Sequence, residues 1–129
     1  EAHYNMGLLL VRMSRPIDAV AHYQRALALT EDAEIYNELG NALVGGGQLS
    51  EAKNAYGRAI ALRPDDVVSR YNLAEVLLVL GEQALAKGQH RASLAIWRQA
   101  LGELELVLKQ VPGHHRAERR LQQLKERLR

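Results

Sequence analysis

Hydrophobic residues recur along this chain at the three- and four-residue spacing of amphipathic helices, and short polar or glycine-rich segments interrupt them. The clearest run starts after Asp32, a residue type that caps helix N-termini, and three consecutive glycines end it. A second run begins at Ser50 and stops before Pro64, because proline cannot continue a helix. These two runs predict a pair of antiparallel helices joined by a glycine turn.

The same hairpin pattern repeats along the chain. Tyr4-Asn5 recurs as Tyr36-Asn37 and as Tyr71-Asn72. Small residues follow at a spacing of 33 and 34 residues, at Gly7, Gly40 and Ala74. The set Ala19, Tyr23 and Ala26 recurs as Ala52, Tyr56 and Ala59. A period of this length is typical of stacked helical hairpins, in which small residues allow close helix crossings and large ones fill the gaps between hairpins.

This repeat resembles that of the tetratricopeptide repeat (TPR) family, whose pattern is W-x2-L-G-x2-Y, then A-x3-F, then P. The second unit carries most of it, at Leu39-Gly40, Ala52, Tyr56 and Pro64. The resemblance implies an all-α fold, a right-handed α-solenoid of three hairpins at residues 1–32, 33–66 and 67–114, followed by a capping helix at 115–129. We expect one TPR domain over residues 1–129. Because the chain opens at Glu1 without an initiator Met, we expect it to be part of a longer protein.

The third unit departs from the pattern in length. Pro64 and Pro112 lie 48 residues apart, so two added stretches of seven residues account for the excess over one repeat. We expect the first helix to run past Gly81, where a normal unit would turn, giving helices at residues 67–87 and 91–110. Seven residues are close to two helical turns, so each helix keeps its buried face. The prediction is an elongated hairpin whose tip projects by about 10 Å.

Composition supports helices and excludes several classes of protein. The 129 residues include 22 Leu and 18 Ala, and these helix formers far outnumber the aromatic residues that strands favour. The absence of cysteine excludes disulfides and thiolate metal clusters, and it fits a reducing, cytoplasmic location. No apolar run of about 18 residues is present, so no membrane span is predicted.

The formal charge of +2 is unevenly distributed, because residues 1–112 carry −2 and residues 113–129 carry +4. In that basic segment Ala117, Leu121 and Leu124 follow helical spacing, as a solenoid cap requires. Its charges could contact phosphates, but Glu118 and Glu126 interrupt them and no aromatic residue is available for base stacking. Nucleic acid is therefore not the favoured partner.

The family resemblance implies a concave groove that binds peptides. Asparagine suits such a groove because its amide can both donate to and accept from a peptide backbone. Carried over residue by residue, the pattern gives the peptide-binding candidates Asn5, Asn37, Asn41, Tyr71, Asn72, Glu75, Arg116 and Arg120. Leu78 and Arg119 also fall on this face.

Chaperone-binding members of the family hold a peptide's terminal carboxylate with a clamp of Lys, Asn and Arg. This chain offers Asn41, Asn72, Arg116 and Arg120 at such positions, whereas Asn37 replaces the expected Lys. Arginine forks match carboxylates well. The alternative is that these arginines only form the solvated face of the cap.

No catalytic residue, metal site or cofactor is predicted. His115 and Glu118 form an H-x-x-E pair without further ligands nearby, and the glycine triplet lacks the strand and the G-K-[ST] of a phosphate loop. No nucleophile elbow is present. The expected function is a non-catalytic scaffold that binds a peptide segment of a partner protein. Two alternatives stay open: an adaptor that forms homo-oligomers through the long hairpin around Trp97, and an accessory region of a larger enzyme.

Overall fold

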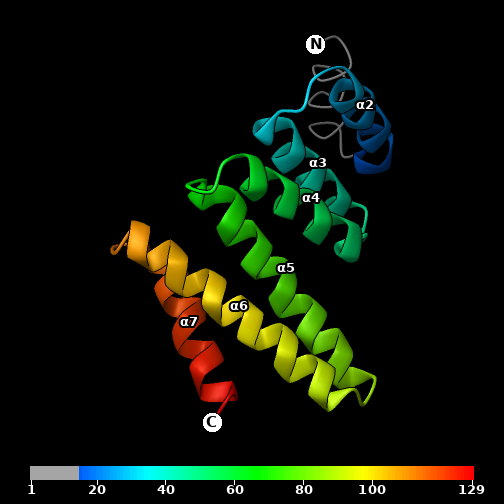
Figure 1. The fold of residues 1–129 in the computed structure, drawn as a ribbon. Coiled ribbons are helices and arrows are strands. Elements are labelled where there is room, and N and C mark those ends of the chain that lie inside the picture. The colour runs from blue at the N-terminus through cyan, green and yellow to red at the C-terminus, as the bar shows by residue number, and fades with distance from the viewer. Residues whose placement is uncertain (1–14) are drawn as a thin grey trace. The chain divides into compact units, whose positions relative to one another are not determined.

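The computed structural model describes residues 15–129, and every regular element in that part of the chain is an α-helix (Figure 1). The helices are α2 (Pro16–Leu29), α3 (Ala33–Gly45), α4 (Leu49–Leu62), α5 (Val67–Ala86), α6 (His90–Gln110) and α7 (His115–Arg127). The chain divides into two compact units, Glu1–Asp66 and Val67–Arg129. The predicted all-helical fold is confirmed, and Asn5 lies outside the described residues.

In the first unit, α3 packs against both α2 and α4. The predicted cap is present, since the Asp32 carboxylate accepts hydrogen bonds from the backbone N–H groups of Glu34 (2.7 Å) and Ile35 (3.4 Å). The glycine turn after α3 places Gly47 at φ +78°, a left-handed conformation that glycine adopts without strain. Local sequence signals therefore set both ends of α3.

A close helix crossing holds the α3–α4 hairpin together. A Cβ atom added at Gly40 would lie only 2.5 Å from Cε1 of Tyr56, so the missing side chain makes room for the tyrosine ring. That ring is 2% exposed, and its hydroxyl donates a 2.6 Å hydrogen bond to Oδ1 of Asn41. The small residue and the aromatic residue of the repeat are thus one packing pair.

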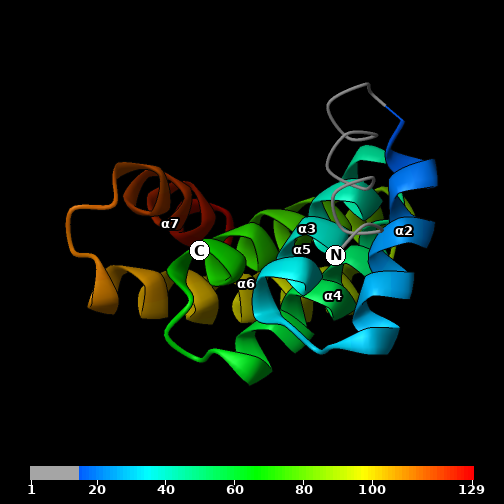
Figure 2. The same ribbon diagram turned by 90° about the horizontal axis from the view of Figure 1, so that it is seen from above.

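The second unit consists of the α5–α6 hairpin with α7 packed against α6 (Figures 1 and 2). The hairpin is elongated as expected, because α5 has 20 residues against 13 in α3, and α6 has 21 against 14 in α4. Each helix is therefore seven residues longer than its counterpart. The capping helix is present as α7 and buries Ala117 and Leu124.

Counted from the turn, the α5–α6 hairpin repeats the packing of the α3–α4 hairpin. A Cβ atom at Gly81 would overlap the indole nitrogen of Trp97, so this pair repeats Gly40 and Tyr56 with the same separation in sequence. The turn is repeated too, since Gly88 has φ +77°. The turn half of α5–α6 therefore matches α3–α4, and counted in this way the added stretches are residues 67–73 and 104–110.

The added end of the hairpin has its own buried contacts. Leu104 and Val107 are both 0% exposed. Arg70 of α5 pairs with Glu103 of α6 at 2.7 Å, and both side chains are less than one-fifth exposed. Ion pairs that are this well shielded from water are screened less than surface pairs. The extension is thus a packed part of the unit, and it supplies the surface beside which α7 begins.

Candidate functional site

Two adjoining hollows lie between α5 and α7, both within the second unit. The first, of about 480 Å³, is bordered by basic and amide side chains. We call it the basic hollow; its lining residues are Tyr71, Asn72, Glu75, Arg116, Arg119, Arg120 and Gln123. Tyr71 and Asn72 belong to the stretch added to α5, so the extension of the hairpin builds one wall of the hollow.

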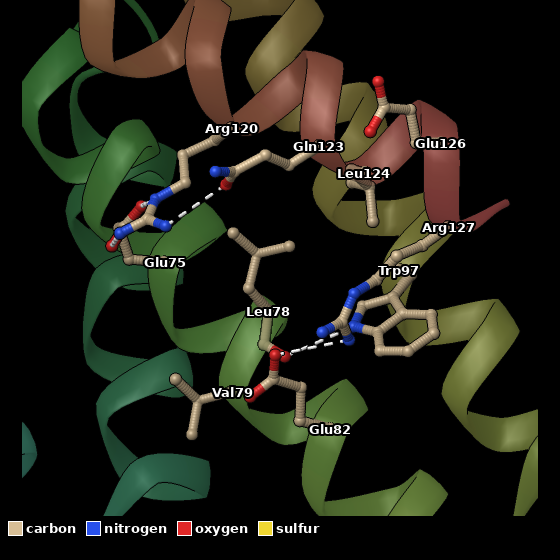
Figure 3. Close-up of a pocket in the computed structure, with 10 residues that line it drawn as sticks. All are labelled: Glu75, Leu78, Val79, Glu82, Trp97, Arg120, Gln123, Leu124, Glu126 and Arg127. Atoms are coloured by element: carbon tan, nitrogen blue, oxygen red, sulfur yellow. Dashed lines mark hydrogen bonds and ion pairs between the residues drawn. The ribbon is translucent and has the colours of Figure 1, made fainter.

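The second hollow, of about 620 Å³, is lined by four apolar and six polar or charged residues, and we call it the apolar cleft after the four. Leu78 and Val79 of α5, Trp97 of α6 and Leu124 of α7 provide its apolar surface. Figure 3 shows Leu78 and Leu124 projecting into the space between the helices. The remaining lining residues are Glu75, Glu82, Arg120, Gln123, Glu126 and Arg127.

An ion pair stands between the two hollows and contributes to both. Arg120 of α7 donates from Nε to Oε1 of Glu75 on α5 at 2.8 Å, and from an Nη atom to Oε2 at 3.4 Å. The guanidinium also reaches Gln123 at 3.4 Å (Figure 3). Contact with the Glu75 carboxylate raises the pKa of Arg120. Arg120 is therefore charged, and its fork is already engaged by a carboxylate of the same chain.

A second ion pair closes the far end of the apolar cleft. Arg127 lies 3.3 Å from Glu82, one heptad beyond the first pair on each helix. Its guanidinium also stands 5.2 Å above the ring centroid of Trp97, within the range of a cation–π contact. Figure 3 shows the indole, the arginine and Glu82 grouped together. This cluster covers one face of the buried tryptophan.

The start of α7 is held beside the basic hollow by His114. Its Nδ1 accepts a 3.1 Å hydrogen bond from the backbone N–H of Ala117, and its ring stacks on Tyr71 with a centroid separation of 4.9 Å. Burial raises the pKa of Tyr71, and the carboxylate of Glu75 raises it further. Tyr71 is therefore a neutral hydroxyl group at the edge of a hollow that carries three arginines.

Of the eight predicted peptide-binding residues, the structure brings five together: Tyr71, Asn72, Glu75, Arg116 and Arg120. Asn37 and Asn41 lie on α3 in the other unit. The acceptor oxygen of Asn41 is engaged by Tyr56, and its amide donates a hydrogen bond to the carboxylate of Glu38. The five grouped residues form the candidate site.

Sequence reasoning missed the polar residues at the far end of the cleft, namely Glu82, Gln123, Glu126 and Arg127. A signal was present, because Glu82 follows Glu75 by seven residues and Arg127 follows Arg120 by seven. Heptad spacing repeats a helix face almost unchanged. Trp97 was expected either to pack or to dock a partner, and at 5% exposure it packs.

The described range, residues 15–129, also bears on metal binding and on membrane insertion. No group of three or more His, Asp or Glu side chains in this range is placed to hold a metal ion. No described helix combines the length and the apolar character needed to cross a bilayer.

Family models match most of the chain. A model described as "Tetratricopeptide repeat" matches residues 4–52, and another with the same description matches residues 67–116. A third, described as "TPR repeat", matches residues 40–81. The residues that carried the resemblance, including Gly40 and Tyr56, lie inside these matches.

Similar proteins of known sequence are much longer than this chain. The human protein O-mannosyl-transferase TMTC1 is 36% identical over 81 residues, which cover 63% of this chain and 9% of that protein. The chain spans about a tenth of the length of the curated relatives it matches.

Solved structures with this fold cover almost the whole chain. The second TPR domain of human RPAP3, in complex with the HSP70 peptide SGPTIEEVD, has a TM-score of 0.76 at 18% identity, covering 95% of this chain and 92% of that one. The type III secretion chaperone SycD of Yersinia enterocolitica, in complex with a peptide of the translocator YopD, has a TM-score of 0.78 at 18% identity, covering 99% and 93%. At such identities the likeness shows the fold.

Proposed function

Because the chain belongs to the tetratricopeptide repeat family, we propose that it is a non-catalytic scaffold that binds a peptide segment of a partner protein, with an acidic group of the peptide in the basic hollow. The proposed function requires a groove that binds the peptide, and it requires no catalytic residue. The partner is defined here by its chemistry, a carboxylate on an extended segment.

The observation that carries this proposal is the concentration of hydrogen-bond donors around the basic hollow. Arg116, Arg119 and Arg120 border it from α7, and Asn72 and Tyr71 face them from α5. In the described part of the chain, Arg116 and Arg119 form no ion pair with a carboxylate. Arginine forks and amide N–H groups are the donors that carboxylates prefer. The hollow therefore favours an anionic group of a ligand.

The structural neighbours support a peptide as that ligand. The RPAP3 domain is in complex with the peptide SGPTIEEVD, whose sequence ends in an acidic residue, and SycD is in complex with a peptide of YopD. We infer a ligand of the same class here, and a cytoplasmic location belongs to the same proposal. The proposal requires no enzyme activity in this chain, although the similar protein TMTC1 is named as a transferase.

Titration with SGPTIEEVD and with its C-terminally amidated form tests the proposal. We expect the free acid to bind more tightly, and Arg116→Ala to weaken it by about tenfold, since a hydrogen bond to a charged group contributes about 1.5–3 kcal/mol. Binding can be followed by the fluorescence anisotropy of a labelled peptide.

Lys125→Ala is the matched control, because it removes the same charge from the same helix at an exposed position that lines neither hollow. Its affinity should stay close to that of the parent chain. If Arg116→Ala and Lys125→Ala weaken binding equally, the effect is one of net charge and the basic hollow is not the site.

A further inference from the structure

The charge of the basic hollow exceeds what one carboxylate can balance. Three arginines of α7 and one glutamate of α5 line it, and its other lining residues are neutral, so the lining carries a formal net charge of +2. A carboxylate brings one negative charge to this surface. The hollow therefore stays positive after a carboxylate has bound, and a ligand group with two negative charges matches it better.

The three arginines stand on one face of α7. Arg116, Arg119 and Arg120 are separated by steps of three and four residues along the helix or lie directly beside such a step, which places their side chains close together. Arg116 and Arg119 are exposed, and within residues 15–129 neither forms an ion pair with a carboxylate. Two neighbouring guanidinium groups can therefore act on one ligand group.

The chain itself balances only the third arginine. Arg120 pairs with Glu75 at 2.8 Å, and the hydroxyl group of Tyr71 also forms a hydrogen bond with this carboxylate. The negative charge of Glu75 is thereby matched by Arg120. What the hollow leaves unbalanced is the pair of positive charges on Arg116 and Arg119, in the first two turns of α7.

Resting on the proposed function, we propose that the anionic group preferred by the basic hollow is the phosphate of a phosphoserine or phosphothreonine in the partner's peptide segment. A phosphate monoester carries a charge of about −1.5 to −2 at pH 7, and its three oxygens accept strong hydrogen bonds. Arginine forks bind such oxygens in pairs, and clusters of arginine recognise phosphorylated segments. The hollow thus matches the ligand both in charge and in the number of donors.

The size of the hollow and its neutral lining residues support this assignment. At about 480 Å³ it lies within the range of about 300–1,000 Å³ that ligand sites occupy. Asn72 of α5 and Gln123 of α7 border it with amide groups, which donate hydrogen bonds to oxygen atoms. A phosphate in the hollow is therefore surrounded by donors from both helices.

This assignment makes binding depend on phosphorylation of the partner. Aspartate or glutamate at the same position of the peptide brings one charge and binds more weakly. A kinase that phosphorylates the partner would therefore strengthen the complex, and a phosphatase would weaken it, without any modification of this chain.

Three labelled peptides test the inference on the intact chain. They share the first eight residues of SGPTIEEVD, followed by phosphoserine, aspartate or serine, and their C-termini are amidated. We expect the phosphoserine peptide to bind about tenfold more tightly than the aspartate peptide, because it adds a hydrogen-bonded charge. Fluorescence anisotropy at constant ionic strength, in a buffer without phosphate, measures the three affinities.

Substitutions at Arg119 separate phosphate from carboxylate. Because a phosphate can engage Arg116 and Arg119 together, Arg119→Ala should reduce the preference for phosphoserine over aspartate to about twofold. Arg119→Lys keeps the charge without the fork and should restore only part of the preference. Lys125→Ala removes a charge from an exposed position of the same helix that lines neither hollow, and it should leave the preference unchanged.

The pH profile adds a readout that a general attraction of negative charge would not give. The second ionisation of phosphoserine lies at about pH 6, whereas aspartate stays ionised above about pH 5. We expect the preference for phosphoserine to rise by about threefold between pH 5 and pH 7.5. Histidines gain positive charge toward pH 5, so His114 and His115 at the start of α7 act against this trend and cannot cause it.

The outcomes separate the two proposals. Equal affinity for the phosphoserine and aspartate peptides, both above that of the serine peptide, would overturn the phosphate assignment and leave the proposed function standing. Equal affinity for all three peptides would overturn both. A preference for phosphoserine that survives Arg119→Ala and Arg116→Ala would place the phosphate outside the hollow and overturn the inference. Displacement of the phosphoserine peptide by single-stranded oligothymidylate at equal phosphate concentration would assign the hollow to nucleic-acid phosphates and overturn it as well.

Discussion

Arg120 and Glu75 form a two-point ion pair across the mouth of both hollows, with contacts of 2.8 and 3.4 Å. The carboxylate of Glu75 therefore occupies one of the guanidinium groups that a peptide carboxylate would use. Both side chains are partly exposed, Arg120 at 44% and Glu75 at 35%, so the pair is accessible to exchange. Under the proposed function Glu75 would compete with the carboxylate of the ligand, and its predicted contact with the peptide stays a prediction.

We predict that Glu75→Gln raises the affinity for an acidic peptide about two- to fivefold, since an exposed ion pair contributes about 0.2–1 kcal/mol. Anisotropy titration of the labelled acidic peptide measures this gain. Glu105→Gln is the control, because it removes the same charge at an exposed position on α6 that lines neither hollow. A loss of affinity in Glu75→Gln would mean that Glu75 contacts the peptide directly.

Gly81→Ala should lower the free energy of unfolding by about 1–3 kcal/mol, because the added Cβ would overlap the buried Trp97 ring and force it to move. Urea denaturation followed by tryptophan emission measures this change, and the emission of the folded state should shift as well. Helix propensity alone would make Gly81→Ala more stable, because alanine favours a helix more than glycine does. A loss of stability therefore points to the overlap with Trp97.

Gly102→Ala on α6 is the matched control, since a Cβ at this helical position meets no atom within 4 Å. Helix propensity then dominates, and the variant should be more stable by about 0.5–1 kcal/mol. Equal effects in the two variants would contradict the packing of Trp97 against Gly81.

These glycines also show what the sequence could and could not determine. The length of the long hairpin was predictable, because proline spacing and glycine turns are local signals. The end of the hairpin that matches the shorter hairpin could not be predicted. Ala74 and Gly81 are both small, lie seven residues apart and share one helix face. Only the partner ring of Trp97 distinguishes them.

The candidate site shows the same limit. The family resemblance implied that Asn72, Arg116 and Arg120 line one groove, and the basic hollow gathers them. The partner of each arginine depends on how closely α5 approaches α7, which no local pattern encodes. The engagement of Arg120 by Glu75 and the apolar cleft beside it are therefore results of the structure.

His114→Ala should destabilise the start of α7. The substitution removes the acceptor for the Ala117 N–H, a cap that contributes about 1 kcal/mol, and the stack on Tyr71, which adds about 0.5–1.5 kcal/mol. Amide exchange of the α7 backbone measures the local loss. His114→Asn should recover part of the stability, because asparagine can cap the helix without stacking.

His115→Ala is the control for this pair of variants. The His115 side chain is 90% exposed and stands next to the cap without serving as its acceptor. We expect its amide exchange to match that of the parent chain. Equal loosening of α7 by both alanine variants would rule out a specific capping role for His114.

The half-buried carboxylate of Glu38, in the first unit, makes the stability of the fold depend on pH. The pKa of Glu38 is raised, first by burial and then by the charge of Glu34, and a hydrogen bond from Asn41 opposes the shift in part. A carboxyl whose pKa is higher in the folded state binds its proton more tightly there. Its contribution to stability is therefore present below the unfolded pKa and is lost as pH rises through the folded value.

Glu38→Gln should accordingly raise the melting temperature at pH 7, where the parent chain carries the unfavourable charge, and have little effect near pH 3, where that carboxyl is protonated. Thermal denaturation from pH 3 to pH 8 measures the difference, which should grow as pH rises above the unfolded value near 4.5. Glu51→Gln, at an exposed position on α4, makes the same change in charge and controls for net charge. A gain in stability that is constant across this range would refute the assignment to ionisation of Glu38.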